Sequence, residues 1–230
     1  MSNLRGSLHP LLIEPNDPHI EPLQGELVEV LNSILRHFAK EMERLKRKDR
    51  PPEIRLYTAI WNECWLRYWG IEFFCDLFSV FTVGPAFAWS HYHLAAKRGS
   101  DLFAVPTRTL STHPADAARM KASLLALEKV GFVREAGAIR QRWDELVSIS
   151  GSEPQPEYYH CYPEPIIESL VQHSLAGTQG VGCNIVGPGA TGTMFRLLNE
   201  AWWQFWKDPQ AYSVWEQQKI NSLRQSASPN

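Results

Sequence analysis

The feature that most constrains the fold of this 230-residue chain is a helical hydrophobic repeat that prolines interrupt. Between Leu27 and Leu45, apolar residues recur at steps of three and four, which places them on one face of a helix. Pro51 and Pro52 follow, and the helix should end before them because proline disfavours helix in the preceding residue and donates no backbone hydrogen bond. No run of strand-like alternation is present. The sequence therefore predicts an all-α fold.

Proline and glycine divide the rest of the chain in the same way. Gly84 and Pro85 mark a bend, and Gly99 and Gly131 follow two further periodic segments. The helices predicted after the first cover residues 53–81, 87–97, 114–130, 135–147, 166–175, 193–206 and 209–223.

Four regions follow from this pattern. We expect a lead-in at residues 1–22, a helical region at 23–149, a Pro-rich connection over the surface at 150–165, and a C-terminal helical extension at 166–230. The last two helices should meet at Asp208, because Asp caps helices and the proline after it fits a first turn. All four regions should pack as one irregular multi-helix array.

Tryptophan is the unusual component of the composition. The chain has nine Trp, and helical spacing within their clusters predicts helices that pack through large aromatic faces, some with an indole N–H near a polar partner. The clustered residues are Trp61, Trp65, Trp69, Trp202, Trp203 and Trp206.

Charge and cysteine content restrict partners and location. The formal net charge of −2 gives no broad attraction for nucleic acid. The most apolar run, 77–89, is too short to span a bilayer. Four widely spaced cysteines indicate buried free thiols, and the first residues lack the apolar segment of a signal peptide. We expect a cytoplasmic protein with neither nucleic-acid partner nor membrane insertion.

Two carboxylates stand out on the second helical segment. Glu72 and Asp76 lie four residues apart, so on a helix they share one face. Burying them on an apolar helix costs free energy unless a cation or hydrogen-bond donors compensate. A solvent-facing stripe, or a partner such as Arg67 or Arg119, would also explain the pair.

The residues after Glu72 carry a resemblance to a known family. The pattern ExxCD, a Gly-Pro bend, a loop and then STHPxxxxR, ending at Arg119, resembles the gluzincin metallopeptidases of the HtpX and CAAX prenyl protease group. The resemblance covers residues 61–119 and implies the later half of a zinc peptidase core. It implies that Glu72 is a zinc ligand, that Asp76 orients a ligand histidine, and that His113 and Arg119 border the site. Cys75 stands where the family usually has Ala.

The HExxH motif of that family is absent from this sequence. It supplies the first two zinc ligands and the general base, and a catalytic zinc needs three protein ligands and a water. The nearest substitute, His37 to Glu41, lacks a second His. We therefore expect a metallopeptidase-like protein that is incomplete or catalytically inactive and does not bind zinc alone. The alternatives are a metal-free helical interaction module with a protein or peptide partner, and a fragment of an active peptidase whose HExxH lies upstream of Met1.

Two remaining patterns carry less chemistry. His91 and His93 are two residues apart and point to different sides of a helix, so we interpret them as packing or surface histidines. Residues 187–192 match GxGxxG, but no second strand is available for a dinucleotide-binding unit, so a loop or hinge is expected.

A last expectation concerns the groove that a missing HExxH helix would leave. The helix from Leu27 to Leu45 is the long amphipathic element available to cover it. We expect that helix to pack against the helix of Glu72, with His37 or Glu41 near the zinc position. Arg119 is the expected basic partner of one of the two carboxylates.

Overall fold

The computed structural model describes residues 21–106 and 111–227, and helices are the only regular secondary structure in these ranges. The all-α prediction is confirmed. The elements are α2 (Glu21–Arg47), α3 (Pro51–Ala59), the π-helix η2 (Ile60–Trp69), α4 (Gly70–Val83), α5 (Pro85–Arg98), α6 (Asp116–Lys129), α7 (Val133–Ser150), α8 (Pro156–Cys161), α9 (Glu164–Gly180), α10 (Thr193–Lys207) and α11 (Tyr212–Ala227). The predicted lead-in lies outside the described residues up to position 20, and its last two residues already belong to α2.

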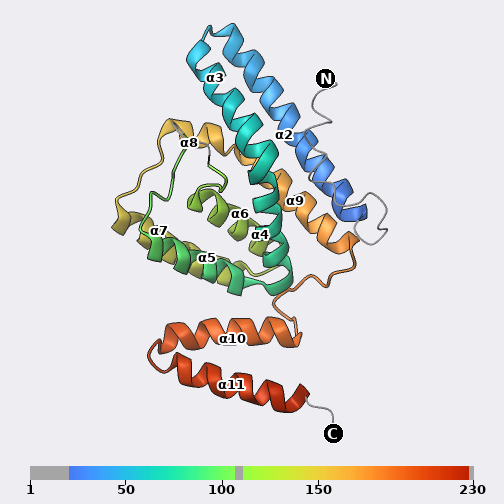
Figure 1. Cartoon of the computed structure of the whole chain (residues 1–230), viewed down its shortest axis with the longest axis vertical. Helices are drawn as coiled ribbons and strands as arrows, with labels where there is room; N and C mark the ends of the chain where they lie inside the picture. Colours follow the sequence, from blue (N-terminus) through green and yellow to red (C-terminus); the bar gives the residue numbers. More distant parts are fainter. Residues whose placement is uncertain (1–20, 107–110, 228–230) are drawn as a thin grey trace.

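The helices form an irregular array around α4 (Figure 1). Helix α4 packs against α5, α6 and α9, while α2 and α3 form an antiparallel pair at one end. Helices α10 and α11 form a hairpin at the other end, and α10 packs on α5 and α4. The predicted irregular multi-helix array is therefore what the chain adopts.

The bounds of several helices follow from proline and glycine. Pro51 and Pro85 occupy the first turns of α3 and α5, where a missing N–H costs nothing. Gly99 ends α5 in the left-handed conformation with φ 60°. Asp208 separates α10 from α11, as predicted, but α11 begins at Tyr212 because a turn follows the aspartate.

The centre of the core is aromatic. Trp65, Trp69 and Phe73 are buried at four-residue spacing, and the rings of Trp65 and Phe73 stack with centroids 5.5 Å apart. The indole N–H of Trp65 donates to the carbonyl of Cys161 at 2.9 Å, and that of Trp69 donates to the carbonyl of Ser111 at 2.9 Å. The expectation that buried indoles find polar partners is confirmed for these two residues.

The π-helix η2 was not predicted. It joins α3 to α4 in one continuous helical rod and spans ten residues, whereas π-helices are mostly single-turn insertions. Its residues include no proline or glycine to mark it in the sequence. Hydrophobic periodicity alone therefore predicts an ordinary helix there.

The predicted surface connection at 150–165 is partly buried. It contains α8, and Tyr158, Cys161 and Tyr162 are buried there. The ring of Tyr162 stacks on Trp69 with centroids 4.8 Å apart. Aromatic side chains thus draw a proline-rich segment into the core.

The predicted docking of the first long helix on α4 is wrong. Helix α2 packs chiefly along α9 and meets α4 only marginally. Both helices contribute buried apolar side chains, among them Ile34 and Leu170, and His173 Nδ1 lies 2.6 Å from Glu26 Oε2. The apolar stripe of α2 therefore faces a helix from the C-terminal part of the chain.

Candidate functional site

Helix α4 places the two carboxylates as the spacing predicts. Glu72 and Asp76 lie one turn apart, with Asp76 buried and Glu72 partly exposed. Arg119 on α6 holds both oxygens of Asp76, with Nε at 2.6 Å from Oδ2 and Nη2 at 2.8 Å from Oδ1. This is a bidentate charge-assisted pair. The basic partner expected for one carboxylate is confirmed.

Burial and charge act in opposite directions on Arg119. Burial is the largest single influence and lowers the pKa of its guanidinium. The hydrogen bonds and the charge of Asp76 raise that pKa by more in total, so it lies above the ordinary value. Glu72 and Asp116 add negative charge in the same direction. Arg119 is therefore the fixed cation at the centre of several carboxylates.

His113 lies beside Glu72, as the resemblance implies. Its Nδ1 is 3.1 Å from Glu72 Oε2. The side chain of His113 is 63% exposed and that of Glu72 is 35% exposed, so this pair sits at the rim of the buried Asp76–Arg119 pair. All four residues named for the site thus gather at one place.

The loop before α6 is held by aromatic residues. Besides accepting from the Trp69 indole, Ser111 donates from Oγ to the carbonyl of His113 at 2.6 Å. The N–H of Ala115 donates to Tyr162 Oη at 2.8 Å. Hydrogen bonds from the core therefore fix the backbone on both sides of the histidine.

A second polar cluster, which the sequence did not reveal, lies deeper at the start of α6. His91 is buried, with Nε2 at 3.0 Å from the backbone carbonyl of Asp116, and its ring stacks on Trp143. Arg98 Nη2 donates to Asp116 Oδ1 at 2.8 Å. Burial lowers the pKa of His91, which favours a neutral ring that donates from Nε2. The packing interpretation of His91 is confirmed.

The positions of the implied zinc ligands can be compared with the number of ligands that zinc needs. Among residues 21–106 and 111–227, no group of three or more His, Cys, Asp or Glu side chains is arranged to hold a metal ion. Glu72 and His113 are zinc-ligand types, but two ligands fall short of the three that a catalytic zinc takes.

His37 and Glu41 do not lie beside Glu72, contrary to the expectation that one of them would be near the zinc position. They line a separate pocket of about 290 Å³ with Tyr159 and His160. Burial is the main reason that the pKa of His37 is lowered. Their absence from the Glu72 region follows from the docking of α2 on α9.

The cysteines differ in part from the expectation of buried thiols. All four are free; Cys64 and Cys161 are buried, but Cys75 is exposed and Cys183 is intermediate. Cys75 lies on α4 away from the buried positions Phe73 and Leu77. The Cys of the ExxCD pattern is therefore on the exposed side of α4.

A larger cleft lies between α5, α7 and α10, on the far side of α4 from α2. Its volume is about 620 Å³, within the range of ligand pockets, and its lining is mainly aromatic. The lining residues are Pro85, Trp89, Tyr92, Phe132, Glu135, Arg142, Pro188, Phe195, Asn199, Trp202, Trp203 and Trp206. The second tryptophan cluster was the sequence signal for it, although the spacing alone predicted only packing.

The segment 187–192 that matches GxGxxG is an irregular loop, as expected. It leads into α10, and the carbonyl of Phe81 accepts a hydrogen bond from the N–H of Val186 just before it.

None of the described helices is long and apolar enough to cross a membrane. Comparison with models of protein families, with curated proteins and with solved structures finds no match for this chain.

Proposed function

We propose that this chain is a metallopeptidase-like protein that is inactive as a peptidase on its own and carries an incomplete metal site at Glu72 and His113. The 3.1 Å contact between these residues carries the proposal, because a shared rim is what the resemblance implies for them. Had Glu72 pointed to solvent far from His113, a purely structural role for both would be favoured.

The chemistry of the neighbouring residues supports inactivity. Peptide hydrolysis at zinc needs three protein ligands and a base for the attacking water. Asp76, a further carboxylate of the cluster, is held by Arg119 through both oxygens. It is therefore committed to an ion pair and supplies neither a third ligand nor a base.

Zinc binding would thus require ligands from outside the described residues. Three sources are open: residues 1–20 and 107–110 of this chain, sequence encoded upstream of Met1, or a partner chain. Reading the gene upstream of Met1 tests the second, because an in-frame HExxH there identifies this chain as a fragment of an active peptidase.

A zinc-content measurement tests the incomplete site. The purified chain is incubated with one equivalent of zinc, passed through a desalting column and analysed by mass spectrometry. We expect far less than one zinc per chain, and the same residual content in Glu72→Gln and in the control Glu168→Gln on α9. One zinc per chain, lost in Glu72→Gln only, would show that this chain completes the site.

A second candidate function is a helical interaction module with a protein or peptide partner. The aromatic cleft between α5, α7 and α10 favours it, since Trp203 and Trp206 remain 58% and 43% exposed there. Exposed aromatic side chains gathered in one place mark interaction sites. The cytoplasm is the proposed location for either function, supported by four cysteines that form no disulfide.

A further inference from the structure

The aromatic cleft between α5, α7 and α10 combines features that select a cationic ligand. We propose that it binds a peptide segment of a partner protein through one arginine or lysine side chain that enters the cleft and lies against its aromatic rings. The inference is independent of the Glu72 site, because no residue of that site lines the cleft.

The first feature is the arrangement of rings. Trp206 lies 5.8 Å from Trp89 and 5.8 Å from Tyr92, measured between ring centroids, so rings from α5 and α10 meet across the cleft. Trp203 on α10 also lines it and is more than half exposed. Ring faces attract cations through their quadrupole.

The second feature is the charge that lines the cleft. Arg142 on α7 donates to Glu145 at 2.7 Å, so its charge is already balanced by an acidic neighbour. Glu135, about two turns before Arg142 on the same side of α7, has no ion-pair or hydrogen-bond partner among the described residues. Arg134 precedes it in the chain but does not line the cleft. With Arg142 paired, Glu135 is the lining carboxylate left to meet a cationic ligand, while Lys207 lies over Trp203 at the rim and does not line the cleft.

The third feature is an ammonium group already seated on one of the rings. Lys207 Nζ lies over the ring of Trp203 at 4.7 Å from its centroid. This intramolecular contact is the same interaction that the proposal assigns to the ligand. It shows that a ring at the cleft rim is accessible to a cation.

Two polar groups favour a peptide over an isolated cation. Asn199 uses its amide nitrogen to donate to the carbonyls of Val83 and Phe195, at 3.1 Å and 2.8 Å. Its Oδ1 is thereby left to accept a backbone N–H. Arg142 retains N–H groups for a peptide carbonyl. A donor and an acceptor beside a cation site match a backbone on either side of a basic residue.

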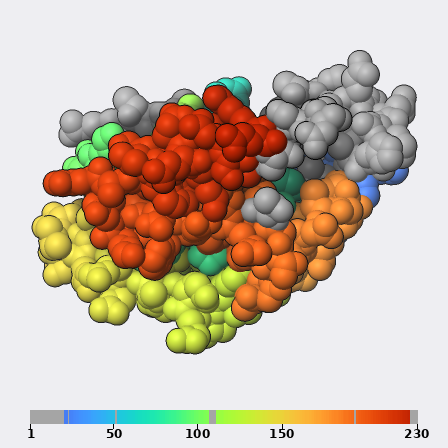
Figure 2. Space-filling view, turned by 90° about the horizontal axis from the view of Figure 1, so that it is seen from below, coloured from blue at the N-terminus to red at the C-terminus, as the bar shows by residue number. Residues whose placement is uncertain are grey.

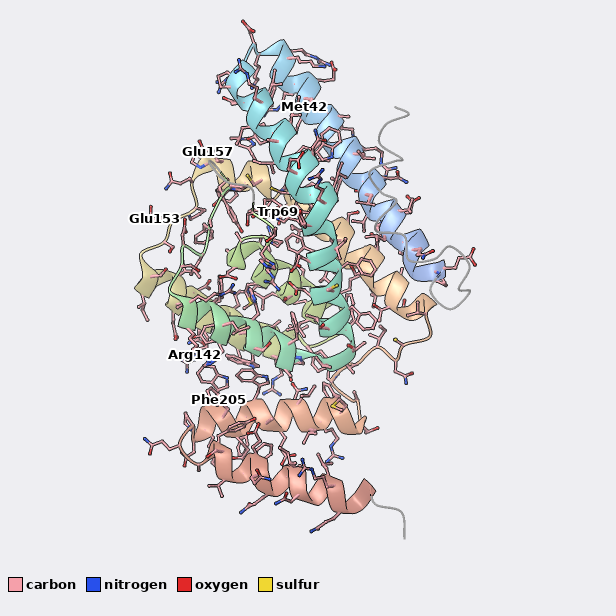
Figure 3. All side chains as sticks on the ribbon, in the orientation of Figure 1. Met42, Trp69, Arg142, Glu153, Glu157 and Phe205 are labelled. Atoms are coloured by element: carbon pink, nitrogen blue, oxygen red, sulfur yellow. The ribbon has the colours of Figure 1, made fainter. Side chains whose placement is uncertain are left out.

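Figures 2 and 3 show the elements around the cleft. Figure 3 shows Arg142 on the α7 side and Phe205 on the α10 side of the layer of side chains between these helices. Seen from below in Figure 2, α10 and α11 cover the middle of this face, with residues of α7 emerging beside them.

Fluorescence anisotropy with matched peptides tests the proposal. The probe is a labelled, end-blocked heptapeptide with arginine at its centre and leucine on either side. The control peptide carries citrulline in place of arginine, which keeps the shape and removes the charge. We expect the full-length protein to bind the arginine peptide about tenfold more tightly than the citrulline peptide.

Protein variants locate the binding. Glu135→Gln should lose about tenfold in affinity for the arginine peptide and little for the citrulline peptide. Glu168→Gln removes an exposed carboxylate on α9 and should change neither. Trp206→Ala should weaken both peptides while near-ultraviolet circular dichroism reports an intact core.

Several outcomes would overturn the proposal. Equal binding of the arginine and citrulline peptides, equal effects of Glu135→Gln and Glu168→Gln, or no binding of either peptide at millimolar protein would each contradict it. Arginine amide alone, competing as well as the peptide, would show a small-cation site instead of a peptide site.

Discussion

Arg119 holds both carboxylate oxygens of Asp76, at 2.6 Å and 2.8 Å, from a helix that begins more than thirty residues after α4 ends. The side chains are 16% and 9% exposed. This pair links α6 to α4 and is more buried than the neighbouring pair of Glu72 and His113, which forms the rim. The site therefore depends on an ion pair that water screens weakly.

Removing one member of this pair should destabilise the fold. Arg119→Met leaves the carboxylate of Asp76 buried without a cation, and we expect a loss of about 3 kcal/mol in the free energy of unfolding. Replacing both residues together, as Arg119→Met with Asp76→Leu, should recover most of it. Urea denaturation measures each value. The exposed pair Lys121–Glu164, at 2.8 Å, is the control and should matter far less when Lys121 becomes Met.

Gly84 should resist substitution more than Gly99 does. Both have positive φ, 68° and 60°, but a Cβ at Gly84 would lie 2.8 Å from Phe195 Cε2, whereas none lies within 4 Å at Gly99. We expect Gly84→Ala to cost about 3 kcal/mol and Gly99→Ala about 1 kcal/mol. Gly84 also has ψ −144°, whereas Gly99 is left-handed helical with ψ 22°, so equal losses in urea denaturation would show that neither this backbone conformation nor the contact with α10 adds to the cost.

Stability should fall in mild acid because of His91. Its pKa in the folded state lies below the ordinary value of 6.5 because burial disfavours the charged ring. Below pH 6.5 the unfolded chain therefore binds a proton that the folded chain does not, so stability is complete above that pH and is lost as pH falls.

Urea midpoints between pH 7.5 and pH 5 measure this dependence. His91→Gln, which can still donate to the Asp116 carbonyl, should flatten the profile. The pKa of His37 is also lowered by burial, so His37→Gln should remove a further, smaller part because that residue is less buried. A His91→Gln profile identical to that of the wild type would contradict the assignment.

Asp208 should hold the start of the last helix. Its Oδ1 accepts from the N–H groups of Gln210 and Ala211, each at 3.1 Å. Asp208→Ala should destabilise α11 by about 1 kcal/mol. Amide hydrogen exchange in 212–227 should quicken, with exchange in α4 unchanged. Asp144→Ala, on the exposed face of α7, is the control. If this variant also accelerated amide exchange in 212–227, the effect of Asp208→Ala would be one of general charge.

Local signals in the sequence were sufficient for most helices and for the shared helix face of Glu72 and Asp76. Pro51, Pro85 and Gly99 delimit elements because their backbone preferences act without tertiary partners. The spacing of Glu72 and Asp76 fixes a shared helix face in the same way. Their proximity to His113 and Arg119 came from the family resemblance, and the structure brings all four together.

What the sequence did not reveal depends on partners distant in the chain. Helix α2 could have covered any apolar groove, and only the complementary face of α9 decided its position. Arg98 and Asp116 pair across a loop, with no spacing that predicts it. The π-helical course of 60–69 likewise lacks a local marker. These features are settled by packing, which periodicity does not encode.

The most direct test of the proposed function is hydrolysis of casein by the purified chain with added zinc. We expect no release of soluble peptides above a protein-free control, and no difference between the wild type and Glu72→Gln. Hydrolysis that requires zinc and is abolished in Glu72→Gln would contradict the account, because it would show a complete catalytic site within this chain.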